Sequence, residues 1–342
     1  MAVIPNRRFF SFLLLSSLFA VSLLAGCAIQ PTRPIGQWVG PTQSVPVQMT
    51  TTHYTDCDYT VVSTTHYRII STMTDRAFLT QVAEMMEGAY TVYQSIVPGV
   101  PPTHYPMICY LFATRAQWDS FTKQHLGPDS AVYLHIHQGG YTVYDRYVAY
   151  YFGDGPTCSV AAHEGWHQYV ARHFRGRLPP FIEEGIATSF EGVQFVNGLP
   201  RFNLSINEDR DVALRNAIDD NTLWPLRVIL QMHAGMVVVK NTGSVMAWYA
   251  QAWAFARFLW DGEGGKYRPA FQRMLLDIAR GTVWDPSGSF RSRIGPWVPE
   301  ATIPMLVHYL GVPFSQIDDE YNRYIHTLAY DELIEQSESP PQ

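Results

Sequence analysis

The chain has 342 residues, of which 24 are Lys or Arg and 30 are Asp or Glu, so its formal net charge is −6 at pH 7. Proteins that bind nucleic acid usually carry a strongly basic surface, and we expect no nucleic-acid partner for this acidic chain. Hydrophobic residues make up 47% of the sequence. That content is enough for the core of one large domain or of two close subdomains.

The N-terminus has the pattern of a secretory signal. Two arginines precede an apolar run from Phe9 to Leu24 that ends in small residues. The run is shorter than the roughly 20 residues of a membrane-spanning helix, which favours a cleaved signal over a transmembrane anchor. Residues 24–27, Leu-Ala-Gly-Cys, resemble the lipobox of bacterial lipoproteins. The resemblance implies a signal peptide over residues 1–26, lipidation of Cys27, and a membrane-anchored protein of the cell envelope, at the outer membrane or facing the periplasm.

Residues 27–62 are predicted to be a tether between the lipid and a folded domain. Prolines recur between residues 31 and 46 among Gln, Thr, Ser and Gly, without a helical or strand period. This composition is typical of a linker.

Three cysteines remain once Cys27 is assigned to lipid: Cys57, Cys109 and Cys158. They can form at most one disulfide within the chain, and their spacing does not select the pair. Cys158 is interpreted as a buried thiol or a disulfide partner rather than a metal ligand.

The predicted elements over residues 63–335 favour an α+β fold, in which an N-terminal sheet-bearing subdomain is followed by a mainly helical subdomain. The first part has predicted strands at Thr64–Ser71 and Met107–Ala113, helices at Ala77–Val97 and Thr114–His125, and two strands within 131–152 around a turn at 138–140. Helices are predicted at 157–174, 180–192, 223–234, 244–260, 268–279, 300–310 and 314–329. Residues 193–222 are polar and could be an excursion at the mouth of a cleft or a solvated loop.

The pentapeptide at residues 163–167, His-Glu-Gly-Trp-His, matches the pattern H-E-x-x-H. On a helix, His163 and His167 leave the same face one turn apart and can bind one zinc ion together. Glu164 then lies beside the open coordination position, where it can take a proton from zinc-bound water. The alternative is a pair of core histidines, which is costly without a partner for their polar atoms.

A third ligand is expected because catalytic zinc keeps three protein ligands and one exchangeable position. The predicted helix after Pro179-Pro180 places Glu184 and Glu191 on one stripe. We interpret Glu184 as the ligand and Glu191 as an acceptor for the other ring nitrogen of a histidine. Glu183 lies nearer the apolar face and is the weaker candidate, and the alternative is that the whole stripe is solvated.

The motif His163-Glu164-x-x-His167, followed by Glu184-Gly185-Ile186-Ala187, resembles the gluzincin metallopeptidases, and more closely the peptidase-MA-like domains of exported bacterial proteins. The resemblance implies one zinc ion per chain, held by His163, His167 and Glu184. It also implies that Tyr249 stabilises the oxyanion of the reaction. The alternative is that Tyr249 is a core aromatic. In such folds an edge strand pairs with the substrate backbone, and residues 141–151 are the expected strand.

The function expected from this resemblance is hydrolysis of peptide bonds in a peptide or protein substrate, with Glu164 and Tyr249 as catalytic residues. Two alternatives remain open. One is an exported binding or scaffold lipoprotein that keeps the fold without turnover, although intact Glu164 counts against a purely structural site. The other is a zinc amidase that acts on cell-wall peptides.

Overall fold

A computed structural model of the protein describes residues 32–34, 36–54, 57–102, 104–136, 139–237, 240, 242–330 and 332–334. The predicted signal peptide over residues 1–26 and the predicted lipidation site Cys27 lie outside these residues. Within the ranges described, no helix is long and apolar enough to cross a membrane.

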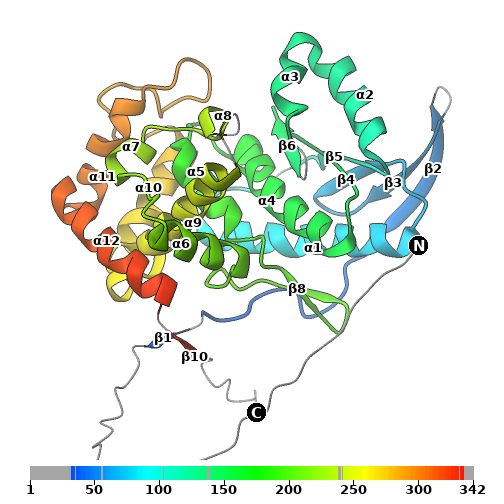
Figure 1. Cartoon of the computed structure of the whole chain (residues 1–342). Helices are drawn as coiled ribbons and strands as arrows, with labels where there is room; N and C mark the ends of the chain where they lie inside the picture. The colour runs from blue at the N-terminus through cyan, green and yellow to red at the C-terminus, as the bar shows by residue number, and fades with distance from the viewer. Residues whose placement is uncertain are drawn as a thin grey trace, which may run out of the picture. The chain divides into compact units, whose positions relative to one another are not determined.

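A six-stranded mixed sheet occupies the N-terminal half of the described chain (Figure 1). Its strands are β2 (Gln48–Tyr54), β3 (Cys57–Ser63), β4 (Tyr67–Ser71), β5 (Met107–Phe112), β6 (Gly140–Val143) and β7 (Arg146–Tyr150). Their order is β2-β3-β4-β5-β7-β6, with β4, β5 and β7 parallel and the other pairs antiparallel. β6 and β2 are therefore the two edge strands.

Alternate side chains of the central strands face two different layers, as the period of a strand requires. Cys109 of β5 and Ala149 of β7 join the main core with α1 (Arg76–Ile96) and α4 (Asp154–His173). Phe112 and Val148, from the same two strands, join a second cluster with Trp118 of α2 (Arg115–Leu126). Figure 1 shows α2 and the short α3 (Ser130–Tyr133) on the opposite side of the sheet from α1. A turn of 3-10 helix, Gly127–Asp129, joins α2 to α3.

The C-terminal half is mainly helical. Its helices are α5 (Pro180–Thr188), α6 (Glu208–Asp219), α7 (Leu226–Ile229), α8 (Ala234–Val237), α9 (Thr242–Gly265), α10 (Arg268–Arg280), a 3-10 turn Pro299–Ala301, α11 (Thr302–Leu310) and α12 (Phe314–Tyr330). Helix α9 packs against α5, α6, α10 and α12, and Trp248, Ala252 and Phe255 on it are fully buried. Two small sheets pair β1 (Thr32–Pro34) with β10 (Glu332–Ile334) and β8 (Gln194–Val196) with β9 (Leu199–Arg201). The architecture is thus α+β, with the sheet N-terminal and the helices mostly C-terminal.

The tether predicted over residues 27–62 includes two strands of the sheet. β2 and β3 pair along their whole length, from Gln48↔Ser63 to Tyr54↔Cys57. Upstream of them, Val39 exchanges two backbone hydrogen bonds with Phe202, at 2.9 and 2.8 Å. The composition misled the prediction because β2 is an edge strand whose side chains are mostly exposed and polar, as they would be in a linker.

Four further predictions need correction. The hairpin that precedes the metal-binding motif turns at Tyr144-Asp145 rather than at residues 138–140, and of residues 141–151 only the β6 part lies at the sheet edge. Residues 193–222 contain the β8–β9 hairpin, which turns at Asn197 and Gly198 with φ of 53° and 79°, and helix α6. Such positive φ values suit an Asn-Gly turn between two strands. The helix predicted over 223–234 is only the short α7.

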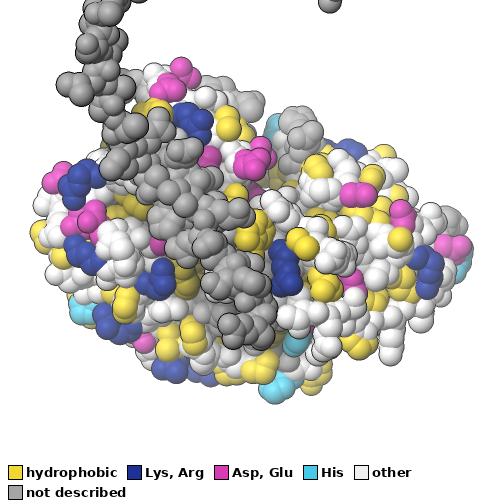
Figure 2. Space-filling view, turned by 90° about the horizontal axis from the view of Figure 1, so that it is seen from below, with side chains coloured by type: hydrophobic (Ala, Val, Ile, Leu, Met, Phe, Trp, Pro, Cys, Tyr) yellow, Lys and Arg dark blue, Asp and Glu magenta, His cyan; other side chains and the backbone are white. Residues whose placement is uncertain are grey.

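The surface mixes charged and apolar side chains. On the coloured part of the face drawn in Figure 2, basic and acidic side chains are interspersed. Among large hydrophobic residues, Tyr144 and Ile294 are the most exposed of those described, at 86% and 91%. The thiols of Cys57, Cys109 and Cys158 are free. Of the two interpretations of Cys158, the structure therefore agrees with a buried thiol and not with a disulfide partner.

Candidate metal centre

Helix α4 presents both histidines of the motif to the interior. His163 and Glu164 are 9% and 8% exposed, and the side chain of His167 is 16% exposed. The helix approaches α1 closely at Gly165, where an added Cβ would lie 2.6 Å from the hydroxyl of Tyr93. That hydroxyl donates a 2.5 Å hydrogen bond to the carbonyl of Ala162. The small residue inside the motif therefore allows the close packing of α4 against α1.

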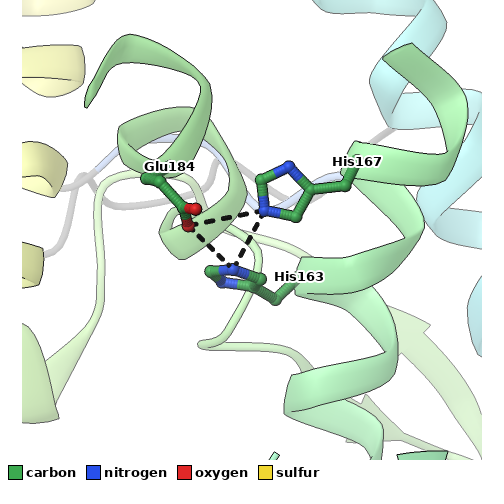
Figure 3. Close-up of side chains that lie close together, drawn as sticks. All are labelled: His163, His167 and Glu184. Carbon is green, nitrogen blue, oxygen red and sulfur yellow. Dashed lines mark hydrogen bonds and ion pairs between the residues drawn. The ribbon is translucent and has the colours of Figure 1, made fainter. Parts of the chain in front are cut away.

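Helix α5 carries Glu184 to the same place. It packs against α9 so closely that a Cβ on Gly185 would lie 2.1 Å from the carbonyl oxygen of Ala252. The glycine thus brings the two backbones together and fixes the direction in which the neighbouring Glu184 points. Figure 3 shows Glu184 facing His163 and His167 across the gap between α5 and α4.

The three expected ligand atoms form a nearly equilateral triangle. Nε2 of His163 lies 3.3 Å from Nε2 of His167. Oε2 of Glu184 lies 3.3 Å from the first nitrogen and 3.4 Å from the second. A tetrahedral centre with bonds of about 2.0–2.1 Å, as zinc makes to nitrogen and oxygen, has edges of about 3.3–3.4 Å. The triangle therefore has the dimensions of one face of such a tetrahedron.

Each histidine is oriented by a carboxylate on its other ring nitrogen. Nδ1 of His163 lies 2.9 Å from Oε1 of Glu191, as the sequence predicted for that residue. Nδ1 of His167 lies 3.0 Å from Oε1 of Glu183. Glu183, the weaker ligand candidate, therefore contacts His167 as Glu191 contacts His163. A proton on each Nδ1 leaves the Nε2 lone pair directed at the centre of the triangle.

The chemistry of this donor set fits a metal cation. Oε2 of Glu184 is buried without a hydrogen-bond donor among the described residues, and lone pairs of three atoms face the same point. Burial opposes the charged form of His163, but interactions with Glu184 and Glu191 outweigh it and raise its pKa to about 9. Burial also opposes ionisation of Glu184, yet His167 and His163 lower its pKa. The triangle therefore stabilises positive charge, which protons or a cation can supply.

Residues 193–222, expected to be an excursion at a cleft mouth or a solvated loop, supply two groups that hold Glu191. Arg210 of α6 donates from Nε and Nη2 to the two carboxylate oxygens, both at 2.9 Å. Asn207, the N-cap of α6, donates to Oε2 at 3.0 Å. Against the cost of burial, Arg210 and His163 lower the pKa of Glu191 to about 2, so that it stays ionised. One sequence signal could have pointed to Arg210, a charged run after a polar helix-capping residue, but nothing in it indicated Glu191 as the partner.

The predicted general base Glu164 is held by a residue of the edge strand. Thr142 of β6 donates from Oγ1 to Oε2 of Glu164 at 2.8 Å. No described residue hydrogen-bonds to the other carboxylate oxygen. The sequence carries no signal for this contact of Thr142, because only the strand order places β6 beside α4.

Tyr249 of α9 lies beside the same centre. Its ring is half-buried, with its centroid 6.3 Å from that of His163. The guanidinium carbon of Arg210 sits 5.2 Å from the ring centroid of Tyr249. Burial, and then the negative charge of Glu184, raise the pKa of Tyr249 well above its ordinary value. The phenol therefore remains protonated, and able to donate a hydrogen bond, at neutral pH.

Compared with known proteins, the chain matches no family model, no curated protein and no solved structure.

Proposed function

We propose that the protein is a zinc metallopeptidase of the gluzincin type that hydrolyses peptide bonds. The observation that supports this most strongly is the triangle of His163, His167 and Glu184, with sides of 3.3, 3.3 and 3.4 Å. Two imidazoles and one carboxylate are a ligand set of catalytic zinc sites, in which the fourth position stays exchangeable. We propose one zinc ion per chain.

A bound zinc ion would supply Lewis-acid chemistry, which makes water acidic near neutral pH and polarises a carbonyl group. Glu164 accepts the proton of the attacking water and passes it to the leaving amine. Tyr249 donates a hydrogen bond to the oxygen on which negative charge develops. Glu191 and Glu183 keep the two imidazoles in the tautomer that leaves Nε2 as the ligand atom.

The first test of this proposal is metal content, measured by mass spectrometry on the full chain and on a Glu184→Ala variant. We expect about one zinc per chain in the parent and less in the variant, because catalytic zinc needs its third ligand. A parent protein that retains no metal after careful preparation would overturn the proposal and favour a binding or scaffold lipoprotein.

The second test is Glu164→Gln, assayed with fluorescein-labelled casein as an unfolded protein substrate. The variant should keep zinc and lose about 10²–10⁴-fold in rate, since it cannot accept the proton. Equal activity in parent and variant would exclude Glu164 as the base. If the protein releases peptides from purified peptidoglycan but leaves casein uncleaved, the result would instead support the zinc amidase.

We also propose that the mature protein is anchored to the membrane of the cell envelope through lipid on Cys27. The proposal rests on the sequence of residues 24–27 and on the apolar run before them. Growth with labelled palmitate would test it: a Cys27→Ala variant should take up no label, whereas a labelled variant would contradict the assignment.

A further inference from the structure

Thr142 connects the edge strand of the sheet to the metal-binding helix. Its hydroxyl lies 2.8 Å from Oε2 of Glu164 and 3.1 Å from the backbone carbonyl of the same residue. A hydroxyl has one proton, and the carboxylate oxygen is the nearer of the two acceptors. The two residues are 22 positions apart in the sequence, so the contact exists only because β6 lies beside α4.

The alternation of β6 directs this side chain at α4. Tyr141 and Val143 face the second cluster, on the α2 side of the sheet. Thr142, between them, must point to the opposite side, where α4 lies. The hydroxyl is half-buried there and reaches Glu164 without leaving its strand.

The register of the hairpin decides where the backbone of Thr142 points. Val143 pairs with Arg146 across the two-residue turn, and Thr142 pairs with Tyr147. The pair that closes a two-residue turn exchanges both hydrogen bonds, and the next pair exchanges none. The N–H and C=O of Thr142 therefore point away from β7, towards the edge of the sheet, where an extended peptide can add as a further strand.

We propose that Thr142 is a positioning residue, which fixes the general base Glu164 to the strand segment whose backbone binds an extended peptide substrate. The inference rests on the proposed peptidase function. The backbone groups of Thr142 hold the peptide in register. The hydroxyl of Thr142 holds one carboxylate oxygen of Glu164, which leaves the other oxygen to accept the proton. One residue thereby sets the distance between the base and the scissile bond.

The test compares Thr142→Val, which removes the hydroxyl at nearly constant volume, with Thr142→Ser, which retains it. With labelled casein we expect kcat of the Val variant to fall by about ten- to a hundredfold, as small displacements of catalytic groups do. KM should stay unchanged because the backbone groups remain, and the Ser variant should recover most of the rate. Zinc content should equal that of the parent in both.

A matched control is Thr72→Val. Thr72 also donates its hydroxyl to a side chain, Oε1 of Gln117 at 2.8 Å, but away from the metal centre. This variant should lose stability without losing kcat. The inference is overturned if Thr142→Val is as active as the parent, if Thr142→Ser is equally defective, or if the loss of rate follows a loss of zinc.

A second measurement separates the inference from the proposed function. Thr142→Val and Glu164→Ala are made singly and together, and the metal-free proteins are unfolded with urea. We expect Thr142→Val to lower the midpoint when Glu164 is present and to have a smaller effect when Ala replaces it, because only the backbone carbonyl of residue 164 then remains as an acceptor. Additive effects would overturn the link between the two residues. If the parent hydrolyses nothing but the effects are non-additive, the peptidase proposal fails and the link stands.

Discussion

The pair formed by Arg210 and Glu191 gives the sharpest prediction about the metal centre. Replacing Arg210 with Met removes two hydrogen bonds of 2.9 Å and leaves a buried carboxylate with only Asn207 and His163 as partners. The side chains of Arg210 and Glu191 are 14% and 17% exposed. Removing one partner of a buried ion pair costs about 3–5 kcal/mol, and we expect about 3 kcal/mol here because Asn207 remains.

The matched control is Arg172→Met. Arg172 also binds a carboxylate, Asp145, at 2.8 Å, but the two side chains are 31% and 40% exposed. Exposed pairs contribute about 0–1 kcal/mol because water already solvates both charges. Urea denaturation of the two variants should therefore differ by about 2 kcal/mol or more in unfolding free energy.

The Arg210→Met variant also tests whether Glu191 orients the candidate ligand His163. Without Arg210, Glu191 should orient His163 less firmly, and zinc affinity should fall by about ten- to a hundredfold. Competition with a chromophoric chelator measures that affinity in Arg210→Met, in Arg172→Met and in the parent. If both variants bind zinc as the parent does and unfold alike, the assigned role of Arg210 is wrong.

Three further predictions concern Tyr249, the packing of α5 against α9, and an ion pair of α12. Tyr249→Phe should lower kcat on casein by about 10²–10³-fold with zinc content unchanged, whereas full activity would make this residue a core aromatic only. Gly185→Ala should destabilise the protein by about 1–3 kcal/mol or more, because the new methyl group would meet the backbone of α9. In the control Gly155→Ala, the methyl group meets nothing within 4 Å, and we expect no such loss. Equal urea midpoints for the two variants would contradict the close approach of α5 to α9. Burial opposes ionisation of Glu320, but hydrogen bonds from Lys266 and Tyr267 lower its pKa to about 2. Glu320 should therefore stabilise the protein at neutral pH. Because its pKa is lower in the folded state, this contribution is complete above pH 4.5 and is lost as the pH falls towards 2. The unfolding free energies of the parent and of Glu320→Gln should therefore converge over that range. A constant difference between them would refute the assignment.

Local spacing in the sequence predicted the candidate ligands of the centre. His163 and His167 are one helical turn apart, so the period of the helix predicts that they lie together. Glu184 lies on the next helix, and the packing of α5 against α4 and α9 brings it to the two histidines. The same period predicted Glu191 as an acceptor for a histidine. Short-range patterns also predicted the long helices, such as α1, α4 and α9, to within a few residues at most ends.

The tertiary structure alone decided which residues support those ligands. Arg210 reaches Glu191 over 19 positions and Thr142 reaches Glu164 over 22, and neither spacing reflects a helix or strand period. The strand order places β6 beside α4, and the packing of α6 on α9 brings Arg210 to Glu191 and Tyr249. β2 was missed for a related reason: an edge strand with exposed polar side chains has the composition of a linker, and only its pairing with β3 makes it part of the sheet. Local periodicity therefore predicted the candidate metal ligands on each helix, whereas long-range packing brought the two helices together and supplied the groups that hold these ligands.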